Sequence, residues 1–185
     1  MAKHIDRIER LFEKSPVVDF KSIERLAGNY AKLLVHNMLK QGRIKKLGKG
    51  VYTRHDEASL TVFAFNPAYL GLQSALSHHG LWEQETIPVI LTGKKARRGI
   101  RKVMGSNVLI RHLDKKYLFG FELCQEQGFY LPYSDVEKTF IDMIVFNQNI
   151  DPDVLKSMRR RMSKRRLGEY LKRYPKNIRE RIAKV

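Results

Sequence analysis

Residues 28–52, GNYAKLLVHNMLKQGRIKKLGKGVY, decide the fold. In the first half apolar residues recur at helical spacing, and in the second half two short segments suited to strands flank Gly48-Lys49. We predict a helix that follows a turn at Gly28 and has Asn29 as its N-cap, and then a basic β-hairpin. The residues predicted to face inward from this helix are Ala31, Leu34, Val35, Met38 and Leu39.

Two amphipathic segments precede this helix. Residues 5–12 carry apolar side chains at helical spacing, Pro16 ends that pattern, and residues 20–26 fit a second helix of about two turns. A short helix, a glycine turn, a third helix and a basic hairpin, in this order, are typical of a winged helix-turn-helix. We therefore predict a DNA-binding domain of this type over residues 1–57, with the third helix as recognition helix and the hairpin as wing.

The outward face of the third helix is polar and mostly cationic, which suits contact with base edges and phosphates. The cations of the wing face no acid along the chain before Asp56, so attraction to phosphate is favoured over a purely protein-binding role. Asn29 and His36 are the better candidates for base readout, and the lysines for phosphate contacts. The predicted DNA-binding residues are Asn29, Tyr30, Lys32, His36 and Lys40 on the recognition helix and Arg43, Lys45, Lys46, Lys49 and Arg54 on the wing.

The composition agrees with a nucleic-acid partner. The chain has 36 Lys and Arg against 19 Asp and Glu, and this formal charge of +17 exceeds what solubility requires of a small domain. The single cysteine, Cys124, allows no internal disulfide and no cysteine-rich zinc site, so we expect no metal or cofactor and a reducing, cytoplasmic setting. The most apolar stretch, residues 60–72, is interrupted by Asn66-Pro67 and is too short to cross a bilayer. We expect no membrane contact.

A second unit, of α+β or α/β class, is predicted over residues 58–185. Ser134 would cap a helix that runs to Phe146, with Glu137 as its capping-box partner, and Asp142 would pair with Lys138 one turn earlier. Residues 151–185 keep apolar residues at helical spacing, so we expect basic helices with their cations outward. The other predicted elements are a helix at 72–79 and strands at 87–91, 108–110, 118–124 and 128–131. Residues 58–65 form a nearly continuous apolar run that fits a helix or a strand, and we favour a helix.

Two basic segments lie outside the predicted winged helix. Residues 94–102 hold six cations and no acid between two predicted strands, which predicts an exposed, mobile loop. This loop is either a solvated charge run or a second phosphate contact beside the wing. Residues 151–185 carry 13 basic and 4 acidic groups. Possible contacts to the nucleic-acid backbone are Lys94, Lys95, Arg97, Arg98 and Arg101 in the first segment and Arg159, Arg160, Lys164 and Arg165 in the second.

Four short motifs occur in order along most of the chain: residues 42–52 (GRIKKLGKGVY), 74–81 (SALSHHGL), 119–121 (FGF) and 135–142 (DVEKTFID). In these motifs the chain resembles the AbiEi-type antitoxins of type IV toxin–antitoxin systems, which are also transcriptional autoregulators. The resemblance implies a winged-helix domain that binds operator repeats upstream of its own gene pair, as a monomer or a dimer. It also implies a C-terminal domain that counters a nucleotidyltransferase-like toxin, with residues 94–102 as a possible surface for that toxin or its RNA substrate.

No catalytic machinery is needed to explain the motif residues, and we expect no enzyme. Ser74 is interpreted as a packing residue because spacing supplies no base and no orienting group for a nucleophile. The adjacent His78 and His79 would point about 100° apart on a helix, which rarely allows both to bind one metal ion. The alternatives are an RNA-binding or protein-binding adaptor and a metal-dependent nuclease, for which Asp114, Lys116, Glu83 and Glu85 are the candidate residues.

Overall fold

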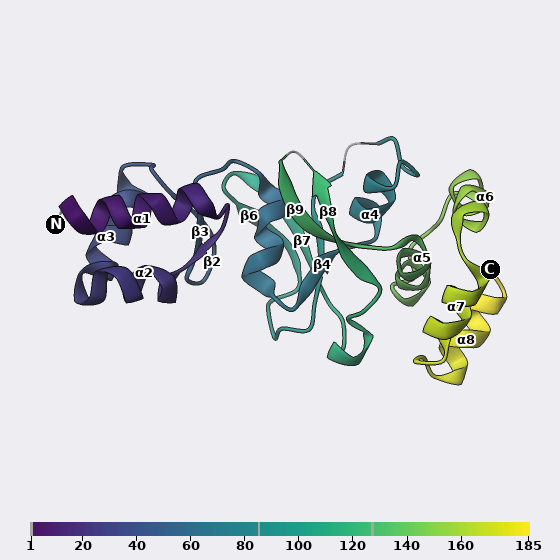
Figure 1. Ribbon diagram of the computed structural model, residues 1–185. Helices are drawn as coiled ribbons and strands as arrows, with labels where there is room; N and C mark the ends of the chain where they lie inside the picture. Colours follow the sequence, from purple (N-terminus) through teal and green to yellow (C-terminus); the bar gives the residue numbers. More distant parts are fainter. Residues whose placement is uncertain (1, 85, 127) are drawn as a thin grey trace.

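The computed structural model describes residues 2–84, 86–126 and 128–185 as a mixed α+β fold (Figure 1). A small N-terminal unit is followed by a mixed sheet and then by a group of helices. The N-terminal unit and the C-terminal helices lie at opposite ends of the molecule in Figure 1, with the sheet between them. The fold class predicted from the sequence is therefore confirmed.

The N-terminal unit has the element order of a winged helix-turn-helix. Its helices are α1 (Ala2–Lys14), α2 (Phe20–Ala27) and α3 (Ala31–Lys40), with the 3-10 turn η1 (Gly28–Tyr30) between the last two. The strands β1 (Val18–Asp19), β2 (Lys45–Gly48) and β3 (Val51–Thr53) form an antiparallel sheet in the order β1-β3-β2. The inward residues predicted for α3 do enter the core, together with Ile8 of α1 and Ile23 of α2.

Two local predictions for this unit were wrong. Asn29 does not cap α3: it lies inside η1, and Tyr30 precedes the helix with a helical backbone and no capping bond from its side chain. A 3-10 turn that runs directly into a helix supplies backbone bonds where a side-chain cap is otherwise needed. The turn of the wing is at Lys49-Gly50, one residue later than predicted, because Gly50 takes the positive φ of 69°.

The second unit is built on a mixed sheet. Within the described residues its strands lie in the order β6-β7-β5-β4-β9-β8, with β4 parallel to β9 and β5 parallel to β7. The strands are β4 (Ala68–Leu70), β5 (Val89–Thr92), β6 (Gly99–Val103), β7 (Ser106–His112), β8 (Phe121–Glu126) and β9 (Phe129–Ser134), and the helical segments among them are η2 (Ala58–Phe65), α4 (Gln73–His78) and η3 (Lys115–Tyr117). The four strands and the helices at 58–65 and 72–79 that the sequence predicted are all present, the first helix as a 3-10 helix.

Alternate residues of the central strands enter two different cores. Leu70 and Ile90 pack with η2 on one face of the sheet, whereas Tyr69 and Leu91 pack with α5 (Val136–Val145) on the other. Because both faces are buried, these strands are apolar throughout and lack the polar alternation of a half-exposed strand. The short strand β4 was not predicted for this reason.

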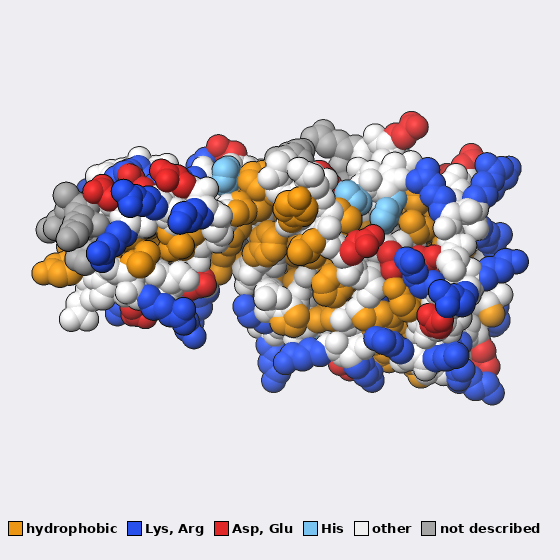
Figure 2. Space-filling model, viewed as in Figure 1, with side chains coloured by type: hydrophobic (Ala, Val, Ile, Leu, Met, Phe, Trp, Pro, Cys, Tyr) orange, Lys and Arg blue, Asp and Glu red, His pale blue; other side chains and the backbone are white. Residues whose placement is uncertain are grey.

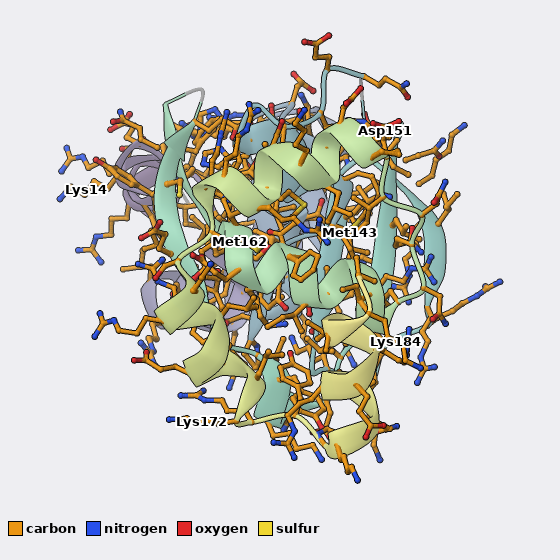
Figure 3. All side chains as sticks on the ribbon, turned by 90° about the vertical axis from the view of Figure 1, so that its right-hand side faces the viewer. Lys14, Met143, Asp151, Met162, Lys172 and Lys184 are labelled. Atoms are coloured by element: carbon orange, nitrogen blue, oxygen red, sulfur yellow. The ribbon has the colours of Figure 1, made fainter. Side chains whose placement is uncertain are left out.

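The C-terminal segment forms the amphipathic helices that the sequence predicted. Helices α6 (Pro152–Arg161), α7 (Lys164–Leu171) and α8 (Lys176–Ala183) pack on α5 at one end of the molecule (Figure 3). Met158, Tyr174 and Ile182 are buried in this contact, and the arginines and lysines of the three helices are largely exposed. Among all helices in the described part of the chain, none combines the length and the apolar character needed to span a bilayer.

Three predictions for the second unit were also wrong. Residues 94–102 are not one long loop, because Gly99–Val103 forms strand β6, which pairs with β7 at the edge of the sheet. Cationic side chains are tolerated there because an edge strand keeps one side in water. The N-cap of α5 is Asp135 rather than Ser134, since the Asp135 carboxylate accepts a bond from the Lys138 amide at 2.7 Å. Glu137 is not a capping-box residue: its carboxylate accepts the Ser163 amide before α7.

The predicted pair of Lys138 and Asp142 is confirmed, and it is completely buried. Both side chains have 0% exposure and form an ion pair along α5, and the Tyr69 hydroxyl donates to the Asp142 carboxylate at 2.6 Å. Rings of Tyr69 and Phe119 lie 5.4 and 5.3 Å from the Lys138 ammonium. Burial lowers the pKa of Lys138 and raises the pKa of Asp142, so each charge depends on the other for compensation.

We expect Lys138→Met to lower the free energy of unfolding by about 3–5 kcal/mol, because it leaves a buried carboxylate without its cation. Adding Asp142→Asn removes that charge and keeps an oxygen acceptor for the Tyr69 hydroxyl, so the double variant should regain most of the loss. Urea unfolding followed by circular dichroism measures both. Losses that simply add would contradict this account of the pair.

Candidate nucleic-acid interface

The predicted contact residues of α3 all lie on its solvent side. Asn29, Tyr30, Lys32, His36 and Lys40 are exposed, whereas Ala31, Leu34, Val35 and Met38 are buried. At about 100° per residue, Lys32, His36 and Lys40 project roughly opposite to the buried row. The helix is therefore held by one face and exposes the other to solvent.

Leu33 is a further residue of this face that the sequence analysis missed. It is 49% exposed and, at about 100° per residue, lies between Lys40 and Asn37 around the helix. The signal was present in the sequence, because Leu33 is an apolar residue within the otherwise polar face. An apolar side chain at such a position can contact the methyl group of thymine in the major groove.

The wing offers fewer free cations than its sequence indicates. Glu9 of α1 forms ion pairs with both Arg43 and Arg54, the latter at 3.6 Å, and Lys45 pairs with Asp56. No acid follows these cations along the chain before Asp56, but the fold brings Glu9 of α1 to them from outside the hairpin. Of the five predicted wing residues, Lys46 and Lys49 are exposed and have no ion pair with any acid in the described part of the chain.

The wing and the second unit together line a cleft of about 640 Å³, which we call the basic cleft. One wall comes from β2 and its turn, and the other from residues 94–96 and 101–104. All charged residues that line it, among those the structure describes, are basic: Lys46, Lys49, Lys94, Lys95, Arg101 and Lys102. The structure thus brings together two basic segments that lie more than forty residues apart in the sequence.

The individual cations of the 94–102 segment are held to different degrees. The Lys94 ammonium donates to the Ala64 carbonyl at 3.1 Å, and the Arg101 guanidinium lies 5.6 Å from the ring of Phe65. Lys95 and Lys102 are exposed. Arg97 and Arg98 are exposed as well but lie outside the lining of the cleft. Lys102 was not among the predicted contact residues, but it lines the basic cleft together with Lys94, Lys95 and Arg101.

The predicted backbone contacts of the C-terminal helices are not part of this cluster. Arg159 and Arg160 lie on α6 and Lys164 and Arg165 on α7, at the end of the molecule opposite the winged helix (Figure 1). Arg159 donates to the Val185 carbonyl, and Arg165 lies 4.0 Å from Glu169 on its own helix. These cations therefore belong to a surface separate from the basic cleft.

The motif residues weighed for catalysis or metal binding have structural partners. The Ser74 hydroxyl accepts the Val89 amide at 2.8 Å, His78 contacts Glu126 at 2.7 Å, and His79 donates to the Ser134 carbonyl at 2.8 Å. The described residues contain no group of three or more His, Cys, Asp and Glu placed to bind a metal.

Of the acids weighed for a nuclease, Asp114 has a structural role. The Asp114 carboxylate accepts the Lys116 amide at 3.3 Å and caps η3. Glu83 lies in the loop between α4 and β5, and Glu85 lies outside the described residues.

Comparison with known proteins supports the fold of the chain. The chain matches no protein-family model and no curated protein. Among solved structures it is similar to the crystal structure of the RV2827C protein from Mycobacterium tuberculosis, with a TM-score of 0.64 over 98% of this chain and 74% of that chain. The two sequences are 15% identical over the matched region, so this likeness supports the fold alone.

The contact of the wing with η2 generates a prediction for the cleft. A Cβ atom added to Gly48 would lie 2.7 Å from the Cβ of Ala64, so Gly48→Ala should lower the free energy of unfolding by about 1–3 kcal/mol. Ala64→Gly removes the opposing atom, and the double variant should therefore be more stable than the sum of the single losses.

Gly168→Ala is the matched control in α7, where an added Cβ meets nothing within 4 Å. It should leave stability unchanged or raise it. If the losses in free energy of unfolding for Gly48→Ala and Ala64→Gly simply add in the double variant, positions 48 and 64 are not in steric contact.

Proposed function

We propose that this protein is a sequence-specific DNA-binding transcriptional regulator. The exposed face of α3 would enter the major groove, where Asn29 and His36 contact base edges near the start and the middle of the helix. Lys32 and Lys40 would contact flanking phosphates. The wing would lie along the backbone beside the groove, with Lys46 and Lys49 as its free cations.

The basic cleft is the observation that carries this proposal. A single wing with two free lysines is a small electrostatic surface, but Lys94, Lys95, Arg101 and Lys102 extend it from the winged helix onto the second unit. A phosphate backbone that follows the wing would reach these cations next. Each neutralised phosphate releases counterions, so such a surface gives salt-dependent affinity without sequence preference, and α3 supplies the preference.

The autoregulatory part of the proposal rests on the resemblance to AbiEi-type antitoxins. Operator repeats upstream of its own gene are therefore the DNA to test first. Three motif residues outside the winged helix, Ser74, Lys138 and Asp142, are buried and have internal partners. Their burial supports a role in packing the second unit rather than in an exposed surface for a toxin. Neutralisation of a nucleotidyltransferase-like toxin, or contact with its RNA substrate, is the remaining part of the proposal.

The deciding experiment is fluorescence-anisotropy binding to the upstream DNA, to a random duplex and to a single-stranded RNA, at about 50 and 200 mM salt. Retention of the upstream DNA at the higher salt, with release of the other two, is the expected result. Equal affinities for both duplexes, each lost at the higher salt, would contradict operator recognition. Tighter binding of the RNA would favour the RNA-binding alternative.

For the recognition helix, we expect His36→Ala and Asn29→Ala to reduce the preference for the upstream DNA over the random duplex. Loss of one good base contact costs about 1–3 kcal/mol, or roughly five-fold to 150-fold in affinity for the preferred site only. The ratio of the two dissociation constants, measured side by side, is the readout. An equal loss of affinity for both duplexes would show that these residues do not read bases.

For the basic cleft, we expect Lys49→Ala and Lys95→Ala to weaken binding to all duplexes alike. Each change should also reduce the slope of log affinity against log salt by about 0.9. Lys172→Ala is the matched control, since Lys172 is an exposed lysine that follows α7 at the far end of the molecule (Figure 3). A control that changes the slope as much as the cleft variants would disprove the assignment of the cleft.

A further inference from the structure

The strand at the second edge of the sheet, β8, has an exposed apolar face. Leu123 is 64% exposed and Tyr130 of β9 is 62% exposed, and Phe121 is also partly open to solvent. By the register of β8 with β9, in which Gln125 lies opposite Tyr130, these three side chains project from the same side of the hairpin. Hydrophobic side chains gather in the middle of Figure 2, where Figure 1 places β8 and β9.

The same hairpin is free of positive charge. Residues 117–137 contain no Lys, Arg or His and include the acids Glu122 and Glu126, in a chain with a formal charge of +17. The opposite edge of the sheet, β6, carries Arg101 and Lys102 and adjoins the basic cleft. Exposed cations are a common protection against edge-to-edge pairing, so β6 is protected in this way and β8 is not.

The backbone of β8 is also ready to pair. The Asp135 amide donates to the Gly120 carbonyl at 2.9 Å, which makes Gly120 and Asp135 a hydrogen-bonded pair of the β8–β9 ladder. Along an antiparallel ladder such pairs recur at every second residue. Phe121, Leu123 and Gln125 therefore direct their amide and carbonyl groups away from β9, toward the open edge.

We propose that β8 is a homodimer interface, in which the β8 strands of two copies of this chain pair in antiparallel orientation. A second copy fits this edge because neither hairpin brings a cation to the contact, whereas two β6 edges would bring arginine and lysine together. Pairing would join the two sheets into one and cover Phe121, Leu123 and Tyr130 of each copy. This inference does not depend on the proposed DNA binding.

Among the registers centred on Glu122, Leu123 and Cys124, in the middle of β8, symmetry and charge favour one. Two identical antiparallel strands related by a two-fold axis place one residue opposite its own equivalent at the axis, and this central residue defines the register. Centring on Glu122 puts the two copies of this acid opposite each other, and centring on Cys124 puts Glu122 opposite Glu126, which is unfavourable in both cases. Centring on Leu123 pairs leucine with leucine, Glu122 with Cys124 and Phe121 with Gln125, so no like charges face each other.

The first test is the molar mass of the full chain in solution, without nucleic acid, measured by light scattering over a range of concentrations. The wild-type chain should reach twice its monomer mass of 21.7 kDa. Leu123→Lys should return it to the monomer, because two ammonium groups would meet at the axis. Ile100→Lys is the matched control: Ile100 is 66% exposed on the other edge strand, and this change adds the same charge without touching β8.

A wild-type mass that stays at 21.7 kDa up to the solubility limit would overturn the proposal. So would a dimer that survives Leu123→Lys, or one that Ile100→Lys dissociates equally. Circular dichroism of both variants should match that of the wild type, since an exposed edge position accepts lysine without disturbing the fold.

Disulfide trapping tests the register itself. In a Cys124→Ser background, Leu123→Cys should give a dimer that reducing agent separates, because paired residues at the axis have Cα atoms about 5.5 Å apart. Gln125→Cys in the same background should not cross-link, since its equivalents would be about 13 Å apart along the strands. Efficient cross-linking of Gln125→Cys but not of Leu123→Cys would overturn this pairing.

Discussion

The close contact between Gly48 and Ala64 is the constraint on which the arrangement of the two units depends. Strand β2 can lie against η2 only because residue 48 has no side chain, and Leu47 beside it is buried in the core of the second unit. One hairpin therefore serves as the wing of the first unit and as part of the packing of the second. The basic cleft exists because this contact holds the wing next to residues 94–104.

The edges of the central sheet have opposite electrostatic character. Strand β6 places cations beside the wing, whereas β8 carries acids and exposed apolar groups. A strongly basic protein repels its own copies wherever cations dominate the surface. Because the cations lie on the β6 edge and the exposed apolar groups on the β8 edge, one molecule can attract phosphate at one edge and leave the other edge open to protein.

The sequence predicted the helical parts best. The spacing of Ala31, Leu34, Val35 and Met38 specified the buried face of α3, because one amphipathic helix contains its own periodic signal. Strand β4 gave no such signal, since Tyr69 and Leu70 enter different cores and both are apolar. The ion pairs of Glu9 with Arg43 and Arg54, and the meeting of Lys49 with Lys95, join residues remote in sequence. Local patterns carry no information on such contacts, so the candidate surface was predicted residue by residue but not as a cleft.

The carboxylate of Glu9, on α1, forms ion pairs with two arginines of the wing and offsets part of their charge. A regulator must find a few sites among a large excess of other DNA, and every available cation raises its affinity for all of that DNA equally. If the protein binds DNA as proposed, Glu9 would limit the time spent on irrelevant sequence, because it occupies Arg43 and Arg54 within the protein. An acid that touches no base can in this way sharpen the search for the correct one.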